Sequence, residues 1–324
     1  MKTFKAMGRV VTVGVLMAIA GSVAAQQRYP SKPIRFITPY AAGGSTSFLA
    51  RIVGQKLTES WGQQVLVESR GGGNTIIATE LLAKSPPDGY TILMVSPAIV
   101  VNASLYRKLP YDTIKDFAAV ATLVSYEHFL VVHPSVPANN LQELIALAKS
   151  RPGQLNYATS GILMHLQSEQ FNILAGTQIQ NIPYKGGGPA VADLLGGQVH
   201  MTFAVPPNVI GHVKNGRLKG IAVSGETRMS ALPQVPTFTE AGLPGYNVSS
   251  WYGIIAPAGT PKEIIDKLSA EIARILALPD IKEKLDSQGF QSFVSTPDAF
   301  AALMKADMAK YAKIIKIANI KVED

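Results

Sequence analysis

The chain has 324 residues, no cysteine and a formal net charge of +8 at pH 7. Without cysteine it forms neither a disulfide nor a zinc–thiolate site, and it has no thiol nucleophile. Its basic residues are spread along the chain without a dense cluster. This argues against a nucleic-acid partner, because binding a phosphate backbone needs such a cluster. A modest positive charge either helps to attract small anions or simply serves solubility.

The first 25 residues have the three-part layout of a secretory signal peptide. Three basic residues stand within the first nine positions, an apolar run covers residues 10–20, and small residues lead to Ala25. The apolar run is shorter than the ~20 residues that a membrane-spanning helix needs. We therefore expect cleavage near Ala25 rather than a membrane anchor. The mature chain then keeps 27 basic and 22 acidic residues, a net charge of about +5.

Short β-type runs and helical runs alternate through the first part of the chain. Strands are predicted at residues 34–38, 65–68 and 91–95, with helices through residues 49–57 and 75–84 between them. This alternation favours an α/β protein with parallel strands and helices on both faces of each sheet.

The pattern restarts after residue 124. An amphipathic helix is predicted at residues 141–149, and strands are predicted at residues 129–132, 155–158, 179–183, 199–203 and 218–224. A proline-rich crossing follows at residues 233–245. The last part contains a strand at residues 251–256 and helices at residues 262–276 and 297–317.

These two runs of elements predict two lobes joined by two crossings. Domain 1 is expected to be discontinuous, from residues 26–124 plus 246–324, and domain 2 to cover residues 125–245. Each lobe is expected to hold a mainly parallel sheet flanked by helices.

The first candidate binding site is the turn between the first predicted strand and helix. Two adjacent glycines give the main chain unusual freedom and allow a ligand to approach it. The helix that follows offers unpaired backbone N–H groups and a positive dipole end, which suits an anion, although an ordinary turn has the same pattern. The expected contacts are Tyr40, Ala41, Ala42, Gly43, Gly44, Ser45, Thr46 and Ser47.

Two further loops follow strands in the second part of the chain, at residues 157–161 and 183–189. Because open α/β sheets bind ligands beyond the carboxyl ends of their strands, all three loops are candidates. Lys185 can pair with a carboxylate, although an isolated lysine is more often a solvated surface charge. The remaining expected contacts are Ser96, Ala158, Thr159, Ser160, Gly161, His165, Tyr184, Lys185 and Phe203.

Catalytic motifs are missing from the sequence. It contains no G-x-S-x-G elbow, no H-E-x-x-H motif and no clear metal spacing among its five histidines. We expect no enzyme activity, no catalytic residue, no metal and no cofactor. The alternative is an exported hydrolase, with Ser160 as nucleophile and His165 as base. This alternative is weak, because the two residues are too close in the chain and no orienting acid is evident.

Several short motifs, in their order and spacing, resemble one family. They are Tyr29–Ile34, Pro39–Gly44, Asp88–Thr91, Tyr184–Gly186, Leu194–Val199, Leu232–Thr237, Trp251–Gly253 and Ala256–Pro261. From Tyr29 onward the chain resembles the substrate-binding proteins of tripartite tricarboxylate transporters, also named Bug-type periplasmic binding proteins. The resemblance implies a two-lobed periplasmic-binding-protein fold (Venus flytrap, type II-like) in the periplasm. It also implies a carboxylate held by the first loop and by Thr159–Gly161, partly through water, and delivery to a two-component membrane permease.

Two departures from the family pattern bear on the ligand. Ser47 stands where an acidic residue is usual, which argues against an amino-acid ligand. Ile162-Leu163-Met164 replaces a small polar stretch and adds apolar surface. We therefore expect a small organic carboxylate with an apolar or aromatic body, such as terephthalate, with citrate or a C4 dicarboxylate next. We expect a monomer that is not embedded in the membrane. A sensor component that docks on a membrane receptor is the alternative.

Overall fold

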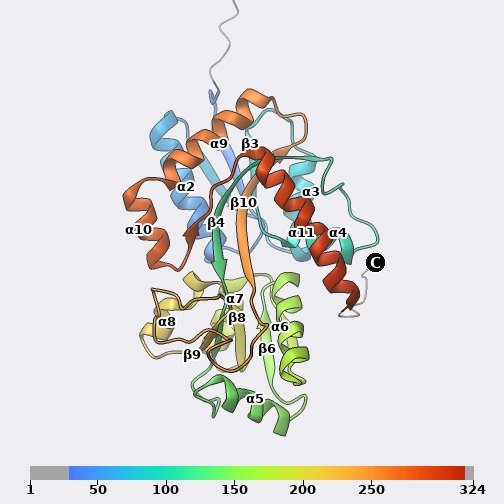
Figure 1. The fold of residues 1–324 in the computed structure, drawn as a ribbon. Coiled ribbons are helices and arrows are strands. Elements are labelled where there is room, and N and C mark those ends of the chain that lie inside the picture. The colour runs from blue at the N-terminus through green and yellow to red at the C-terminus, as the bar shows by residue number, and fades with distance from the viewer. Residues whose placement is uncertain (1–28, 318–324) are drawn as a thin grey trace, which may run out of the picture.

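The structure, a computed structural model, describes residues 29–317. The expected signal peptide and its cleavage site lie outside these residues. Figure 1 shows two α/β bodies, one above the other, with the long strands β4 and β10 running side by side between them. We name the body around the six-stranded sheet the first lobe and the body around the five-stranded sheet the second lobe.

The sheet of the first lobe takes its strands from both ends of the described chain. Its order is β11(Gln291–Ser292), β4(Phe117–Glu127), β10(Ser249–Pro257), β3(Thr91–Val95), β1(Ile34–Thr38) and β2(Val65–Ser69). The helices around it are α2(Ser45–Trp61), α3(Ile76–Ala83), α4(Ala98–Leu105), α9(Lys262–Leu276), α10(Pro279–Ser287) and α11(Pro297–Ile317), with a 3-10 turn η1(Gly73–Thr75) before α3.

The sheet of the second lobe uses the middle of the chain. Its order is β7(Gln180–Pro183), β6(Asn156–Thr159), β8(Met201–Ala204), β5(Phe129–Val132) and β9(Lys219–Val223). The helices around it are α5(Leu141–Ser150), α6(Ile162–Ala175), α7(Gly187–Leu195) and the short α8(Ile210–Lys214), with a 3-10 turn η2(Pro206–Asn208) before α8.

The α/β class and the two-lobed arrangement are confirmed, but both sheets are mixed rather than mainly parallel. The parallel pairs are β1 with β2 and β3, and β6 with β7 and β8. The antiparallel pairs are β10 with β3 and β4, β11 with β4, and β5 with β8 and β9. The difference arises at the crossings. There β4 leads directly into β5, and β10 returns to the first lobe in the opposite direction to β3.

The connection between the lobes is short and is tied together by hydrogen bonds. His128 is the single residue between β4 and β5. The hydroxyl of the fully buried Ser224 accepts a hydrogen bond of 2.9 Å from the backbone N–H of His128 and donates one to the carbonyl oxygen of Val248. Ser224 therefore joins the first crossing at His128 to the second crossing at Val248. The expected domain boundary at residue 124 stays a prediction, and β4 runs three residues past it, to Glu127.

Candidate functional site

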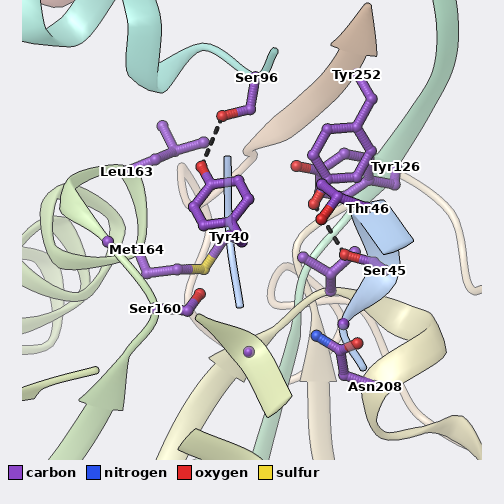
Figure 2. Close-up of a pocket in the computed structure, with 14 residues that line it drawn as sticks. Tyr40, Ser45, Thr46, Ser96, Tyr126, Ser160, Leu163, Met164, Asn208 and Tyr252 are labelled. Atoms are coloured by element: carbon purple, nitrogen blue, oxygen red, sulfur yellow. Dashed lines mark hydrogen bonds between the residues drawn. The ribbon is translucent and has the colours of Figure 1, made fainter. Parts of the chain in front are cut away.

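A pocket lies between the two lobes, lined by fourteen residues. Figure 2 shows the side chains that converge on it. The first lobe contributes Tyr40, Gly44, Ser45, Thr46, Ser96, Tyr126 and Tyr252. The second lobe contributes Ser160, Gly161, Leu163, Met164, Gly187, Val205 and Asn208.

Three helices begin at this pocket. The N-cap of α2 is Gly44 and that of α6 is Gly161, and both line the pocket, as does Gly187, the first residue of α7. No side chain caps any of these three helix N-termini. Their first backbone N–H groups therefore keep their donor capacity, and their dipoles place partial positive charge around one space. This arrangement favours a bound anion.

Hydroxyl groups form the polar wall of the pocket. Tyr40 and Ser96 share a hydrogen bond of 2.9 Å, and so do Ser45 and Tyr252 (Figure 2). Thr46 is different, because its hydroxyl is buried and has no hydrogen-bond partner. A buried hydroxyl without a partner costs free energy, and an oxygen of a bound ligand would satisfy it.

The pocket lining carries no ionisable side chain other than tyrosine. None of the fourteen lining residues is Asp, Glu, Lys, Arg or His. Burial raises the pKa of the phenols of Tyr40, Tyr126 and Tyr252, so these groups stay neutral hydrogen-bond donors at physiological pH. A carboxylate here would be held by helix dipoles and hydroxyls, whereas an ammonium group would find no acidic partner.

The rest of the pocket is apolar and aromatic. The rings of Tyr126 and Tyr252 stack with their centroids 4.7 Å apart. Leu163, Met164 and Val205 come from the second lobe. Apolar side chains and a flexible methionine beside aromatic rings suit the hydrocarbon part of a small ligand.

A second cavity of about 280 Å³ shares the lining residues Tyr40, Ser160 and Gly161 with this pocket. Its other lining residues are Pro39, Gly72, Gly73, Asn74, Thr75, Pro183, Tyr184 and Lys185. We name it the outer cavity, and the pocket of Figure 2 the inner pocket.

The structure brings only part of the expected contact set to these spaces. Tyr40, Gly44, Ser45, Thr46, Ser96, Ser160 and Gly161 line the inner pocket. Tyr184 and Lys185 line the outer cavity. The remaining expected contacts line neither space: Ala41, Ala42, Gly43, Ser47, Ala158, Thr159, His165 and Phe203.

Three of these residues have contacts away from both spaces. Phe203 lies in the core of the second lobe, 5.7 Å from Phe171 between ring centroids. The hydroxyl of Ser47 lies 3.4 Å from that of Ser69, outside the pocket lining. Ser47 therefore does not decide whether an amino acid binds. The argument against an amino-acid ligand rests instead on the lining of the pocket, which contains no acidic residue. His165 lies 3.7 Å from Glu169.

The residues missed by sequence reasoning come mostly from outside the three candidate loops. They are Tyr126, Leu163, Met164, Gly187, Val205, Asn208 and Tyr252. Leu163 and Met164 were recognised as added apolar surface but not as pocket residues. Tyr252 stands in the Trp251–Gly253 motif, which was a signal for its importance. Tyr126 and Asn208 carried no such signal.

Two further features of residues 29–317 concern metal binding and membrane insertion. No group of three or more His, Asp or Glu side chains in this part of the chain is arranged to hold a metal ion. None of its helices combines the length and the apolar character of a membrane span.

Comparison with known proteins shows the family to which the chain is similar. The family model of the tripartite tricarboxylate transporter family receptor matches residues 49–320. The protein BugT of Bordetella pertussis is 35% identical over 317 residues, covering 96% of this chain and 97% of BugT.

Solved structures of similar proteins match the fold. The R. palustris protein Rpa4515 with adipate has a TM-score of 0.87 and 33% identity, over 90% of this chain and 99% of that protein. MatC from Rhodopseudomonas palustris with bound malate has a TM-score of 0.82 and 28% identity, over 89% of this chain and all of that protein. The periplasmic binding protein BugD has a TM-score of 0.87 and 32% identity, over 90% of this chain and 99% of BugD.

Proposed function

Because this chain belongs to the tripartite tricarboxylate transporter receptor family, we propose that it captures a small organic carboxylate with an apolar or aromatic body in the periplasm. It then delivers that acid to the two-component membrane permease of its transporter. In this proposal the chain is exported with cleavage near Ala25, acts as a monomer and catalyses no reaction.

The observation that carries the proposal is the convergence of three uncapped helix N-termini on a pocket without charged side chains. Such a site can stabilise a carboxylate through backbone N–H groups. The unpartnered hydroxyl of Thr46 adds a donor at the same place. Similar proteins are described with adipate and with malate, which are both organic acids.

The body of the ligand is inferred from the apolar part of the lining. The stacked rings of Tyr126 and Tyr252 face a space that Leu163 and Met164 also line. These groups favour a hydrocarbon or an aromatic ring over a heavily hydroxylated chain. Terephthalate is the leading example, and citrate or a C4 dicarboxylate comes next.

Binding is best tested by titration calorimetry of the mature protein with terephthalate, adipate, citrate and glutamate. We expect measurable binding of terephthalate or adipate and none of glutamate, because the inner pocket offers no acidic partner for its ammonium group. A thermal-shift screen over mono-, di- and tricarboxylates extends the panel, since a ligand that binds only the folded state raises its melting temperature. Tight binding of glutamate or citrate, with no response to apolar or aromatic acids, would contradict the proposal.

A further inference from the structure

Helix α11 presents one uniform face to the solvent along the outside of the first lobe (Figure 1). Eight of its side chains between positions 302 and 316 are exposed, and all eight are alanine or lysine: Ala302, Lys305, Ala306, Ala309, Lys310, Ala312, Lys313 and Lys316. With 3.6 residues per turn, these side chains occupy a single arc of about 160° around the helix. We name this arc the Lys–Ala face.

The opposite side of α11 is used by the fold. Its buried side chains lie in the core of the first lobe and are Phe300, Met304, Tyr311 and Ile315. Asp307 accepts a hydrogen bond of 2.7 Å from the indole N–H of Trp251 on β10, so the one acid in the middle of α11 is already engaged. The helix is therefore fixed in its orientation, and the Lys–Ala face is the side that stays accessible to a partner.

The positive charge of the Lys–Ala face is not neutralised within residues 29–317. No carboxylate in this part of the chain pairs with any of its four lysines. By contrast, Lys84 and Lys262 of the same lobe each lie 2.6 Å from an acid one helical turn away. The four free charges extend over about 16 Å of helix. Such a concentration of one sign of charge attracts an anionic partner.

The composition of the Lys–Ala face favours a lipid surface over a protein partner. Protein interfaces are enriched in aromatic residues, methionine and arginine, and they are depleted in lysine and alanine. The Lys–Ala face has the opposite composition, since it contains no aromatic side chain, methionine or arginine. Anionic headgroups require only accessible positive charge, and each lysine near them strengthens binding by about fivefold.

We propose that the Lys–Ala face docks the protein reversibly on an anionic membrane surface. The contact is between lysines and headgroups, and α11 does not enter the hydrocarbon layer, because a helix lying in a membrane interface needs an apolar face that α11 has already buried. Docking would hold a loaded receptor near the membrane that contains its permease. The contact itself does not depend on the proposed function or on the ligand.

Vesicle co-sedimentation tests this contact. The mature protein is mixed with vesicles of phosphatidylcholine alone, or of phosphatidylcholine with phosphatidylglycerol, at low and at high salt. The same measurement is made on a triple variant with Lys305→Gln, Lys313→Gln and Lys316→Gln, and on a second triple variant with arginine at the same positions. Thermal unfolding of each variant checks that the fold is kept.

The matched control removes the same net charge from other parts of the surface. It combines Lys149→Gln in α5, Lys214→Gln in α8 and Lys284→Gln in α10, three exposed lysines on three different helices. Because both glutamine triple variants lose three positive charges, net charge alone affects them equally. A difference between them therefore reports the Lys–Ala face.

We expect the wild-type protein to bind the phosphatidylglycerol vesicles, to ignore phosphatidylcholine alone and to dissociate as salt rises. The α11 glutamine variant should bind about a hundredfold more weakly, whereas the arginine variant and the control should stay within about threefold of wild type.

Two results would overturn the inference. One is a wild-type protein that does not bind the anionic vesicles; if it then binds polyglutamate through the same lysines, the Lys–Ala face fits an acidic protein instead. The other is an equal loss of vesicle binding in both glutamine triple variants. Calorimetry with the best acid of the panel should give wild-type affinity for all variants, so either result leaves carboxylate capture untouched.

Discussion

The backbone N–H of Ala41 donates a hydrogen bond of 3.4 Å to the carbonyl oxygen of Lys185. Ala41 follows β1 in the first lobe, and Lys185 follows β7 in the second, so this bond crosses the cleft. Glycines allow the two main chains to come this close. A Cβ atom added at Gly186 would lie 3.1 Å from the backbone nitrogen of Ala41. The lobes are therefore in contact beside the inner pocket, as expected of a closed binding protein.

Alanine at Gly186 should hinder this closure. Gly186 has an extended backbone that alanine also adopts, so the effect comes from the contact with Ala41. Crowding of this kind costs about 1–2 kcal/mol, which weakens apparent ligand affinity by roughly fivefold to thirtyfold. Calorimetry with the best acid of the panel measures the loss. Gly211→Ala is the control, because a Cβ there meets no atom within 4 Å. Full affinity in Gly186→Ala would show that this contact does not limit closure.

Valine at Thr46 should lower the ligand affinity without lowering the free energy of unfolding. The Thr46 hydroxyl has no protein partner, so its removal leaves the free protein equally stable or slightly more stable. If the ligand uses this hydroxyl, affinity should fall by about 1–2 kcal/mol.

The matched control for Thr46 is Thr113→Val. Thr113 also carries a buried, unpartnered hydroxyl, but it lies outside the inner pocket. Calorimetry and thermal unfolding are measured on both variants. If Thr46→Val and Thr113→Val bound the ligand with the same affinity, the ligand would not use the Thr46 hydroxyl.

Alanine at Ser224 should weaken the connection between the lobes. The change removes the acceptor of the His128 N–H and the donor to the Val248 carbonyl in a fully buried place. Unmade hydrogen bonds of buried groups lower the free energy of unfolding by about 1–3 kcal/mol. Urea denaturation measures it, with the exposed Ser287→Ala as a control that should change it by less than about 0.5 kcal/mol. Equal stability of the two variants would argue against a structural role for this cross-link.

His128 should make the protein sensitive to acid. Burial lowers the pKa of its imidazole to about 3 from an ordinary value of 6.5. Between these values the unfolded chain binds a proton that the folded chain does not. The neutral imidazole of His128 therefore makes its full contribution to the free energy of unfolding above pH 6.5. This contribution is lost as the pH falls toward 3, at up to about 1.4 kcal/mol per pH unit.

Phenylalanine at position 128 keeps an aromatic ring against Tyr126, whose ring centroid lies 5.1 Å away. His128→Phe should show a shallower loss of unfolding free energy between pH 7 and pH 4 than the wild-type protein. Other groups titrate in both proteins, so the difference between the two curves isolates His128. Parallel curves would mean that His128 takes up its proton without unfolding.

Much of the fold follows from local sequence patterns. The predicted strands at residues 34–38, 91–95 and 129–132 agree with β1, β3 and β5 at both ends. Helix α4 was missed because Ala98–Leu105 is mostly apolar and buried around its circumference, and such a run has no amphipathic period. Strand direction was also missed, because alternating strands and helices do not reveal where the chain crosses between lobes.

The binding site was predictable where it depends on strand ends and helix starts. The loops at Gly44 and Gly161 were found because each follows a strand and opens a helix. Tyr126 and Tyr252 were missed because they lie on β4 and β10, whose pairing depends on the tertiary fold. Phe203 was misplaced because one sequence does not show which face of β8 meets the core of the second lobe.

The most direct test of the central claim is a crystal structure of the protein with the acid that binds most tightly. We predict a carboxylate oxygen within hydrogen-bond distance of the Thr46 hydroxyl and of backbone N–H groups at the starts of α6 and α7, with no charged side chain in contact with that carboxylate. An acid bound outside the inner pocket, or a first carboxylate paired with a lysine or arginine, would contradict the claim that uncapped helix N-termini hold the ligand.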